Sequence, residues 1–268
     1  MAKRKRLDLA SIDPRATPGL SGGKREGARE LAQLTPRLAE LQERLYANGV
    51  AGGRESLLLV LQGMDTSGKS GTVKHVLGVV SPLGVHYKGF KAPTADERRH
   101  DFLWRIKKEL PPQGVIGVFD RSQYEDVVAV RVHSLVSRST WLRRYDTINR
   151  FEAGLVGNGM TIVKCFLHIS LEEQRARLLE RLSDPTKYWK YNPADLTERL
   201  LWPDYQEAYA DALTNCDTEA APWHVIPADR KWYRNLAVTR LLVDALEAMK
   251  LEYPPASIDL ELERRRLA

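Results

Sequence analysis

The sequence predicts a three-layer α/β fold, with a mostly parallel central sheet and helices on both of its faces. Short apolar runs without polar alternation are typical of strands that are covered on both faces of a parallel sheet. Segments with apolar residues at helical spacing lie between these runs, so strands and helices alternate along the chain. Of the 268 residues, 43% are hydrophobic, enough for one sizeable core. We therefore expect a single domain with right-handed crossovers between its strands.

Five segments predict strands. The clearest is Leu57 to Leu61, because five apolar residues follow one another without a break. Strands are expected at 57–61, 85–89, 115–119, 161–169 and 224–227. The helices between them are expected at 69–79, 94–110, 122–133, 138–156, 171–182, 196–214 and 230–249.

An apolar stripe precedes the first strand. Leucines recur at steps of three and four from Leu31 to Leu45, which predicts a helix with one apolar face. Thr35 and Pro36 have the pattern of an N-cap and a first helical residue, so two short helices are expected to meet there. The stripe packs on the chain's own core or forms a coiled-coil dimer, and its short length favours the core.

The composition of the chain changes at both ends. The first residues contain the basic cluster Lys3 to Arg6, two prolines and several glycines, which predicts a flexible basic arm. A solvated tail is favoured over a contact with nucleic acid. The expected divisions are this arm at 1–27, one domain at 28–250 that includes a lid at about 183–195, and a C-terminal tail at 251–268.

The net charge of +6 favours a polyanionic partner. Two cysteines, and no apolar segment after the basic N-terminus, predict neither a disulfide framework nor secretion, so a cytoplasmic location is expected. The apolar runs are too short to cross a bilayer, which argues against a membrane as a partner.

The segment after the first strand has the pattern of a phosphate-binding loop. Gly63 to Ser70 reads G-x-x-x-x-G-K-S and lies between a strand and a helix, as this motif requires. In such loops the glycines let the backbone wrap an anion, the lysine adds a positive charge and the serine reaches Mg²⁺. The alternative, a glycine-rich turn with a solvated Lys69, is disfavoured by the intact motif. The expected phosphate contacts are Gly63, Gly68, Lys69, Ser70 and Gly71.

Two carboxylates are expected beside this loop. Asp65 lies inside it, where a carboxylate would repel a phosphate unless a metal ion or a proton is close by. Asp120 ends the third apolar run, and the carboxyl ends of parallel strands meet at one edge of a sheet. We therefore expect Asp65 and Asp120 to hold Mg²⁺. An N-cap role for Asp120 is an alternative that can hold at the same time.

Further polar side chains follow the second and third strands. Arg121 offers a bidentate fork for phosphate oxygens, or pairs with Glu125 instead. Lys88, near the end of the second strand, and Lys91, just past it, are expected to bind a phosphate, because that strand ends at the same edge of the sheet. Glu125 and Arg131 are expected to orient an acceptor, or belong to a solvated helix face.

A lid with several cations is expected near residue 180. Glu173, Arg177 and Arg181 are spaced by four and share a helix face, where one carboxylate cannot neutralise two guanidinium groups. The polar and aromatic segment 184–193 follows, and its length favours a mobile flap over an ordinary surface loop. The cations expected to close over a phosphate are Arg177, Arg181, Lys187 and Lys190.

These residues together resemble the polyphosphate kinase 2 family, P-loop kinases similar in fold to thymidylate kinase. The likeness runs from about Leu45 to Met249. It is specific, because Asp-x-x-Gly-Lys followed by Phe-Asp-Arg-Ser characterises this family among P-loop proteins. The resemblance rests on the segments 63–69, 91–94, 119–122 and 173–190.

The resemblance implies that inorganic polyphosphate and a nucleotide exchange a phosphoryl group with Mg²⁺, and that the chain forms a homo-oligomer. Gln123 stands where many relatives that use nucleoside diphosphates have an aromatic residue, so the chain looks more like the branches that act on nucleoside monophosphates, with Gln123 orienting the acceptor. Ser70 departs from the glycine or aspartate that is frequent at its position. The positions that match the catalytic residues of the family are Asp65, Lys69, Asp120, Arg121 and, in the lid, Arg181.

We therefore expect transfer of a terminal phosphoryl group from polyphosphate to AMP or to ADP. Two other functions stay open. An ATP-dependent nucleoside monophosphate kinase on the same fold would use the same phosphate contacts. A non-catalytic binder of polyanions or nucleic acid would use Lys3 to Arg6 and the cationic segment 88–108, although nucleic acid is disfavoured.

Overall fold

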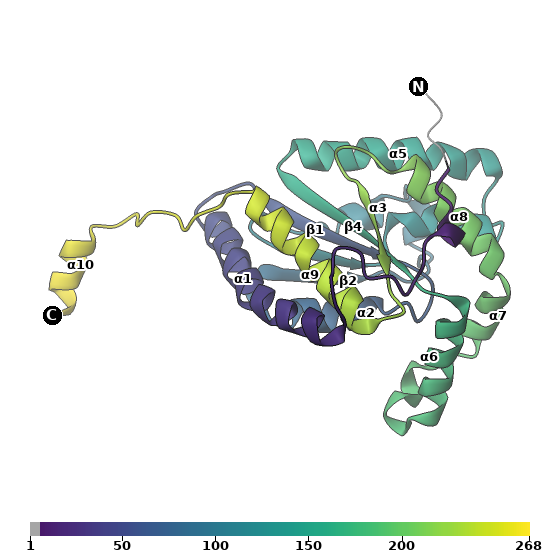
Figure 1. The fold of residues 1–268 in the computed structure, drawn as a ribbon. Helices are drawn as coiled ribbons and strands as arrows, with labels where there is room; N and C mark the ends of the chain where they lie inside the picture. Colours follow the sequence, from purple (N-terminus) through teal and green to yellow (C-terminus); the bar gives the residue numbers. More distant parts are fainter. Residues whose placement is uncertain (1–5) are drawn as a thin grey trace.

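A computed structural model describes residues 6–268 and has a five-stranded sheet at its centre (Figure 1). The strand order is β2-β3-β1-β4-β5, and neighbouring strands pair in parallel. The predicted strands are confirmed to within one residue at each end, and the predicted mostly parallel sheet proves parallel at each of these pairings. The bounds are β1 Ser56–Gln62, β2 Val85–Gly89, β3 Ile116–Asp120, β4 Met160–His168 and β5 Trp223–Pro227.

The central strand β1 is buried along its whole length. Leu57, Leu59 and Leu61 belong to the core on one face of the sheet. Leu58 and Val60 belong to the core on the other face, because successive side chains of a strand point to opposite sides. This double burial explains why the segment has no polar alternation.

Helices α1 (Lys24–Val50) and α9 (Lys231–Ala248) lie side by side over one face of the sheet (Figure 1). Leu38, Leu41 and Leu45 of α1 are buried there, so the leucine stripe packs on the chain's own core, as favoured by the sequence. The prediction of two helices that meet at Pro36 is wrong, because α1 continues through this residue. Leu34 and Leu38, on either side of Pro36, contact the same core, and this contact offsets the cost of a proline inside a helix.

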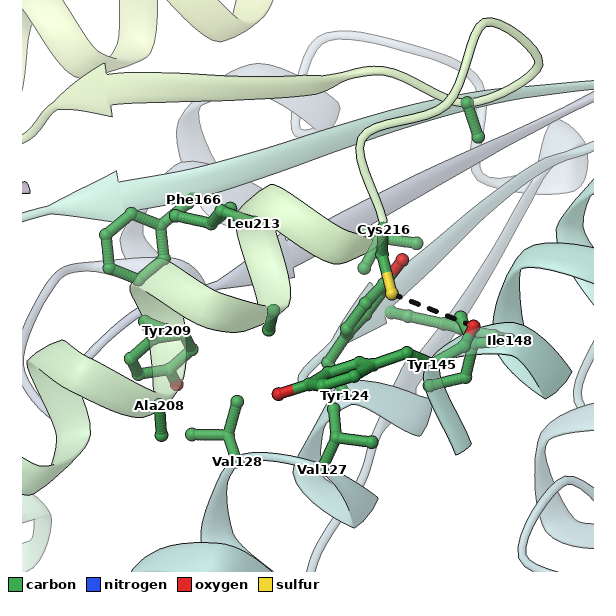
Figure 2. Close-up of a cluster of buried hydrophobic side chains, with 14 of the residues drawn as sticks. Tyr124, Val127, Val128, Tyr145, Ile148, Phe166, Ala208, Tyr209, Leu213 and Cys216 are labelled. Atoms are coloured by element: carbon green, nitrogen blue, oxygen red, sulfur yellow. Dashed lines mark hydrogen bonds between the residues drawn. The ribbon is translucent and has the colours of Figure 1, made fainter. Parts of the chain in front are cut away.

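The other face carries α5 (Arg138–Gly157) and α8 (Trp202–Asn215). Figure 2 shows the side chains between these helices and the sheet, among them Tyr124, Tyr145 and Phe166. Cys216 is fully buried in this cluster, and its thiol approaches the carbonyl oxygen of Tyr145 at 4.0 Å. Two packed cores, one on each face, complete the predicted three layers.

Lys164 and Glu152 form a buried ion pair next to this second core. Nζ of Lys164, on β4, donates to Oε2 of Glu152, on α5, over 2.6 Å, and both side chains are almost completely buried. Tyr124 joins the pair, because its hydroxyl accepts from Lys164 at 2.8 Å and donates to Glu152 at 2.7 Å. A buried charge pair is tolerated where additional hydrogen bonds of this kind satisfy it.

Several predicted helices are shorter or divided in the structure. Segment 94–110 contains only a 3₁₀ turn at Glu97–Arg99 and α3, and segment 122–133 contains a 3₁₀ turn at Gln123–Asp126 and α4. Segment 196–214 divides at Leu201 into α7 and α8, with a proline in the first turn of α8. The remaining bounds are α2 Lys69–Thr72, continued by a π-helical turn at Val73–Leu77, α3 Trp104–Lys107, α4 Ala129–Val132, α6 Leu171–Ser183, α7 Ala194–Leu200 and α10 Leu260–Leu267.

The two ends of the chain differ from each other. Lys3, Arg4 and Lys5 of the predicted basic cluster lie outside the described residues. Residues 6–23, expected as part of a flexible arm, instead pack on the domain, since Leu9 is buried and the backbone N–H of Leu7 donates to Thr214. At the other end, α10 projects away from the body, with all its residues exposed or half-exposed (Figure 1). No helix within residues 6–268 is long and apolar enough to cross a membrane.

Candidate functional site

The phosphate-binding loop, Gly63 to Ser70, joins β1 to α2 at the carboxyl edge of the sheet. Gly63 and Gly68 have φ angles of 147° and 105°, which side-chain-bearing residues rarely adopt. A Cβ atom on Gly63 would come within 2.7 Å of the carbonyl oxygen of Leu167 on the neighbouring strand. Glycine is therefore required at both positions by conformation and by space, since a Cβ atom on Gly68 would overlap the guanidinium of Arg234.

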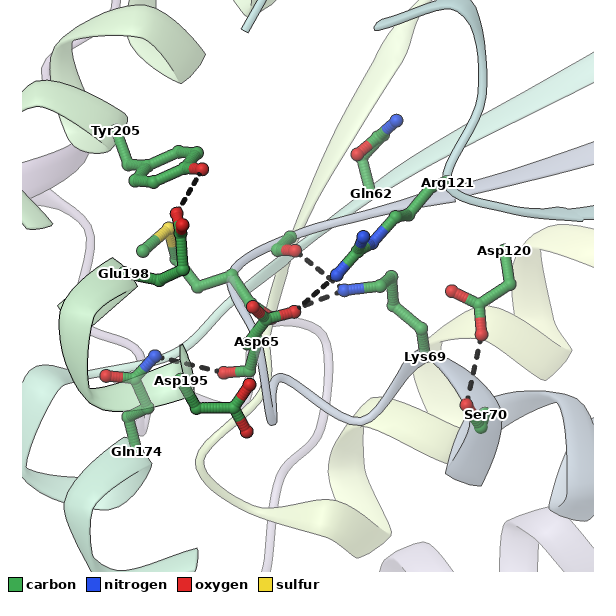
Figure 3. Close-up of polar contacts among 12 residues, drawn as sticks. Gln62, Asp65, Lys69, Ser70, Asp120, Arg121, Gln174, Asp195, Glu198 and Tyr205 are labelled. Carbon is green, nitrogen blue, oxygen red and sulfur yellow. Dashed lines mark hydrogen bonds and ion pairs between the residues drawn. The ribbon is translucent and has the colours of Figure 1, made fainter. Parts of the chain in front are cut away.

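The side chain of Lys69 folds back over its own loop (Figure 3). Its Nζ donates to the carbonyl oxygens of Gly63 at 2.8 Å and Met64 at 3.3 Å, and the side chain is buried. Burial, together with the nearby Arg121 charge, lowers the pKa of Lys69 despite the neighbouring carboxylates. A bound anion would favour the charged ammonium here.

Asp65 and Arg121 form the polar centre of the site. An Nη2 hydrogen of Arg121 is donated to Oδ1 of Asp65 over 2.6 Å (Figure 3). Burial by itself raises the pKa of Asp65, but the positive charges of Lys69 and Arg121 outweigh burial and hold this pKa below its usual range. Asp65 is thus an ionised carboxylate that is hydrogen-bonded to Arg121 and lies within electrostatic reach of Lys69, which reduces the repulsion that it would exert on a phosphate.

Asp120 meets the other end of the loop. It ends β3, opposite Leu61 of β1, and its Oδ2 accepts from the hydroxyl of Ser70 at 3.0 Å. A serine hydroxyl and a strand-end aspartate are the oxygen ligands that P-loop enzymes offer to Mg²⁺. The described residues contain no cluster of three or more His, Cys, Asp or Glu side chains suited to a metal. Mg²⁺ needs only one or two carboxylates beside phosphate and water, so the donor set fits this ion.

A cavity of about 710 Å³ opens beside the loop. Gly63, Asp65 and Arg121 form one side of it, and Lys91 and Glu125, also predicted as site residues, line it as well. Burial raises the pKa of Glu125, although Arg121 and Lys69 lower it. The volume suits a small molecule of nucleotide size. The apolar part of the lining is Met64, Phe90, Ala92, Pro93, Phe102, Ala129, Val130, Leu135, Val136 and Ala194.

The segment expected as a lid, about 183–195, runs from the end of α6 through a 3₁₀ turn at Pro185–Lys190 into α7, and its residues Asn192, Ala194 and Asp195 line this cavity. Arg181 forms an ion pair with Asp195 at 3.1 Å and donates to the carbonyl oxygen of Lys190 at 2.9 Å. The positive charge of Arg181 also lowers the pKa of Asp65, so this arginine lies within electrostatic reach of the loop. Of the other predicted lid cations, Lys187 pairs instead with Glu180 and Asp184, and Nζ of Lys190 lies 5.0 Å from the ring centre of Trp189.

Arg177 lies behind the loop. Its guanidinium donates to the carbonyl oxygens of Thr66 and Ser67, and to those of residues 228 and 229. Because Nε also donates to Glu173, each nitrogen of Arg177 is engaged with protein oxygen. Arg177 therefore binds the backbone of the loop, whereas its spacing in the sequence predicted a contact with phosphate.

Three more predicted site residues do not line the cavity. Lys88 pairs with Glu109. Gln123 turns into the core and donates to Glu152 at 2.9 Å. Arg131 pairs with Asp211 and Glu207 on α8. In each case a carboxylate from a segment distant in the sequence takes the side chain, which spacing along the chain does not reveal.

Other residues of the site were not found from the sequence. Gln174 donates to the backbone oxygen of Asp65 at 3.1 Å and lines the cavity. Glu198 of α7 lines it and accepts from Tyr205 at 2.6 Å, while Nε2 of His133 lies 3.1 Å from the same carboxylate oxygen. Arg234 of α9 lies against the loop from behind. None of these residues belongs to a local motif, so the sequence carries no signal for them.

The chain matches the family model described as polyphosphate kinase 2 over residues 22–254. It belongs to the polyphosphate kinase 2 family. The match includes α1 to α9, with the phosphate-binding loop after β1 and the segment 119–122 at the end of β3. It extends beyond the segment 45–249, over which the sequence resembles the family. This family membership accounts for the agreement between the loop, the strand-end aspartate and the arginine that follows it.

Two curated relatives match most of the chain. An AMP/ADP-polyphosphate phosphotransferase of Meiothermus ruber is 47% identical over 93% of this chain and 92% of its own length. An ADP-polyphosphate phosphotransferase of Rhodopseudomonas palustris is 43% identical over 81% of this chain and 78% of its own length. The crystal structure of polyphosphate kinase 2 from Arthrobacter aurescens superposes with a TM-score of 0.95 at 50% identity, covering 99% of this chain and 94% of that one.

Proposed function

We propose that this polyphosphate kinase 2 transfers the terminal phosphoryl group of inorganic polyphosphate to a nucleotide, with AMP as the first acceptor and ADP as a second. The observation that carries the proposal is the grouping of Asp65, Lys69 and Arg121 at the phosphate-binding loop, where Asp65 and Arg121 also line the cavity. The name of the Meiothermus ruber relative, which includes both acceptors, supports the same pair of nucleotides.

The loop and its two cations suit the donor. Lys69 and Arg121 lie close enough to Asp65 to lower its pKa, so both charges act on one small volume. A phosphoryl group in transfer spreads charge over its equatorial oxygens, and preorganised cations stabilise that charge without reorganisation. We assign Lys69 and Arg121 to this task. In-line transfer then needs positioning and charge neutralisation, and no covalent enzyme intermediate.

The two aspartates suit a metal ion. Asp65 and Asp120 would hold Mg²⁺, with the Ser70 hydroxyl in reach of Asp120, and the bound ion would supply charge neutralisation between donor and acceptor oxygens. Asp65 also orients Arg121 through their hydrogen bond.

The cavity suits the acceptor nucleotide. Its apolar wall can hold a base, while Lys91 and Arg121 lie on the polar side for a phosphate. Arg181 is placed to close over the transferred group, because it stands on the lid and its charge already acts on Asp65. Closure of the lid would exclude water and limit hydrolysis of the donor. A homo-oligomer is proposed on the family resemblance alone.

The test is an activity assay on the purified chain. AMP and Mg²⁺ are supplied with either long-chain polyphosphate or ATP, and products are separated by chromatography. The expected result is ADP, followed by ATP, with polyphosphate as the donor. Turnover of AMP with ATP but not with polyphosphate would establish the ATP-dependent kinase instead.

A non-catalytic binder is tested with the same preparation. If the chain binds polyphosphate but transfers no phosphoryl group, and Lys69→Ala binds as well as the wild type, the catalytic proposal fails. Loss of both binding and turnover in Lys69→Ala supports the proposed role of the loop. Deletion of residues 1–10 is the matched control, because a binder that uses the basic cluster would lose its affinity there.

A further inference from the structure

Arg234 is a buried cation without an acidic partner. It stands in the first turn of α9, and its side chain is only 3% exposed. Nε and Nη2 donate to the amide oxygen of Asn235, and Nη1 reaches the carbonyl oxygen of Ser67 at 3.4 Å. Within residues 6–268 no carboxylate lies in ion-pair contact with it. An unpaired buried charge is costly, and structures rarely keep one without a use.

The guanidinium of Arg234 presses against the phosphate-binding loop. A Cβ atom on Gly68 would overlap the guanidinium, and one on Gly71 would lie 3.3 Å from its Nη2. These two positions therefore allow the cation to approach the loop backbone closely. The opposite side of the same backbone is the surface that receives an anion in loops of this kind.

A second guanidinium increases the positive charge behind the loop. Arg177 and Arg234 both donate to the carbonyl oxygen of Ser67. Arg177 has Glu173 as a carboxylate partner, whereas Arg234 has only neutral oxygens. Burial, and then the charge of Arg177, lower the pKa of Arg234 to about 10, which still leaves it protonated near neutral pH.

We propose that Arg234 is an electrostatic phosphate-site residue, whose charge is neutralised only when the phosphoryl chain of the donor occupies the loop. This deepens the proposed function, because it assigns to the donor site a cation that acts from behind the backbone. A buried charge is screened little by water or salt, so it contributes to anion affinity at short range. The cost of burying it in the free protein is then offset by the ligand.

The inference predicts opposite changes in two measurements. Arg234→Met removes the uncompensated charge and keeps an unbranched side chain, so the free protein should unfold at the same or a higher temperature. The same variant should bind polyphosphate on the order of tenfold more weakly, as expected for loss of one nearby charge at low dielectric. Arg234→Lys keeps the charge and should retain most of the affinity.

Arg240 provides the matched control. It stands on the same helix, but it forms a two-point ion pair with Glu30 of α1. Arg240→Met should therefore lower the unfolding temperature of the free protein, because Glu30 loses its partner, and leave the affinity for polyphosphate unchanged. If Arg234 has only a structural role, Arg234→Met should also lower the unfolding temperature and leave the affinity for polyphosphate unchanged. If Arg234 acts on the phosphate site, Arg234→Met should weaken the affinity without lowering the unfolding temperature.

The experiment titrates polyphosphate into the full-length wild type and the three variants by calorimetry, and follows thermal unfolding with and without polyphosphate. Wild-type affinity in Arg234→Met would overturn the inference, and so would its unfolding at a clearly lower temperature or its failure to fold. If the wild type binds ATP but no polyphosphate, the proposed donor is wrong. In that case the same variants are titrated with ATP, and the affinity for ATP and the unfolding temperature test the role of Arg234 in the same way.

Discussion

The guanidinium of Arg121 donates to Oδ1 of Asp65 over 2.6 Å and so connects the end of β3 to the phosphate-binding loop. Arg121 has a φ angle of 65°, in the left-handed region, and its backbone N–H donates to Leu61 of β1. Strain of this kind persists only where the surroundings determine the conformation, and it is concentrated at functional sites. Asp65 and Arg121 therefore orient each other as one unit.

We expect strong non-additivity when this unit is dissected. Asp65→Asn and Arg121→Lys should each lower kcat/KM by on the order of 10², because each loses a preorganised charge contact. The double variant should be little worse than either single one, since the partner is already misplaced. Steady-state kinetics with polyphosphate and AMP measure the coupling. Losses that multiply in the double variant would show two independent residues.

The pairing of Asp120 with Ser70 predicts a metal-dependent defect. Asp120→Asn should lower turnover by on the order of 10² and raise the Mg²⁺ concentration for half-maximal activity, because one of the expected anionic ligands is removed. Ser70→Ala should change both quantities less, since a hydroxyl contributes no charge. Activity is titrated with Mg²⁺ at saturating substrates. A normal Mg²⁺ requirement in Asp120→Asn would exclude it as a ligand.

The ion pair between Arg181 and Asp195 predicts a change in substrate affinity. Asp195 competes with phosphate for the lid arginine, so Asp195→Asn should lower the KM for polyphosphate several-fold and change kcat little. Arg181→Ala should instead reduce kcat, because it removes the cation. Lys187→Ala is the control, since Lys187 is held by Glu180 and Asp184. A raised KM in Asp195→Asn would mean that Asp195 positions Arg181 productively.

The local patterns of the sequence predicted the architecture well. An apolar run that fills both faces of a parallel sheet has a direct signature, as in β1, and the loop at Gly63 to Ser70 carries its own motif. Apolar residues at helical spacing predict the bounds of helices less reliably. The segments 94–110 and 122–133 have the composition of helices, yet turns interrupt both, and both segments contribute residues to the lining of the cavity.

The partners of individual side chains could not be predicted. The spacing of Arg177 and Arg181 correctly places both on α6, but it does not show that the loop backbone takes up one guanidinium and Asp195 the other. Arg234 has no motif at all, although it lies against the loop. Such contacts join segments far apart in the sequence, and only the folded chain fixes them.

The buried carboxyl of Glu125 predicts a pH-dependent stability difference. Its pKa is raised in the folded protein, first by burial, so its protonated form favours folding and this contribution is lost as the pH rises through the folded pKa. Glu125→Gln should therefore be more stable than the wild type at neutral pH, with the difference disappearing towards pH 4. Thermal unfolding from pH 4 to 8 measures it. A variant that is less stable at neutral pH would show that Arg121 and Lys69 outweigh burial.

The buried pair of Lys164 and Glu152 predicts the largest loss of stability. Lys164→Met leaves the Glu152 carboxylate buried without its cation and should cost about 3–5 kcal/mol of unfolding free energy. Replacing both residues with methionine should recover much of this loss, because the uncompensated charge then disappears, although the hydroxyl of Tyr124 loses its partners. Urea denaturation of both variants and the wild type provides the comparison. If the double variant is as unstable as Lys164→Met, the lost hydrogen bonds of Tyr124 and Gln123, rather than the bare carboxylate, determine the cost.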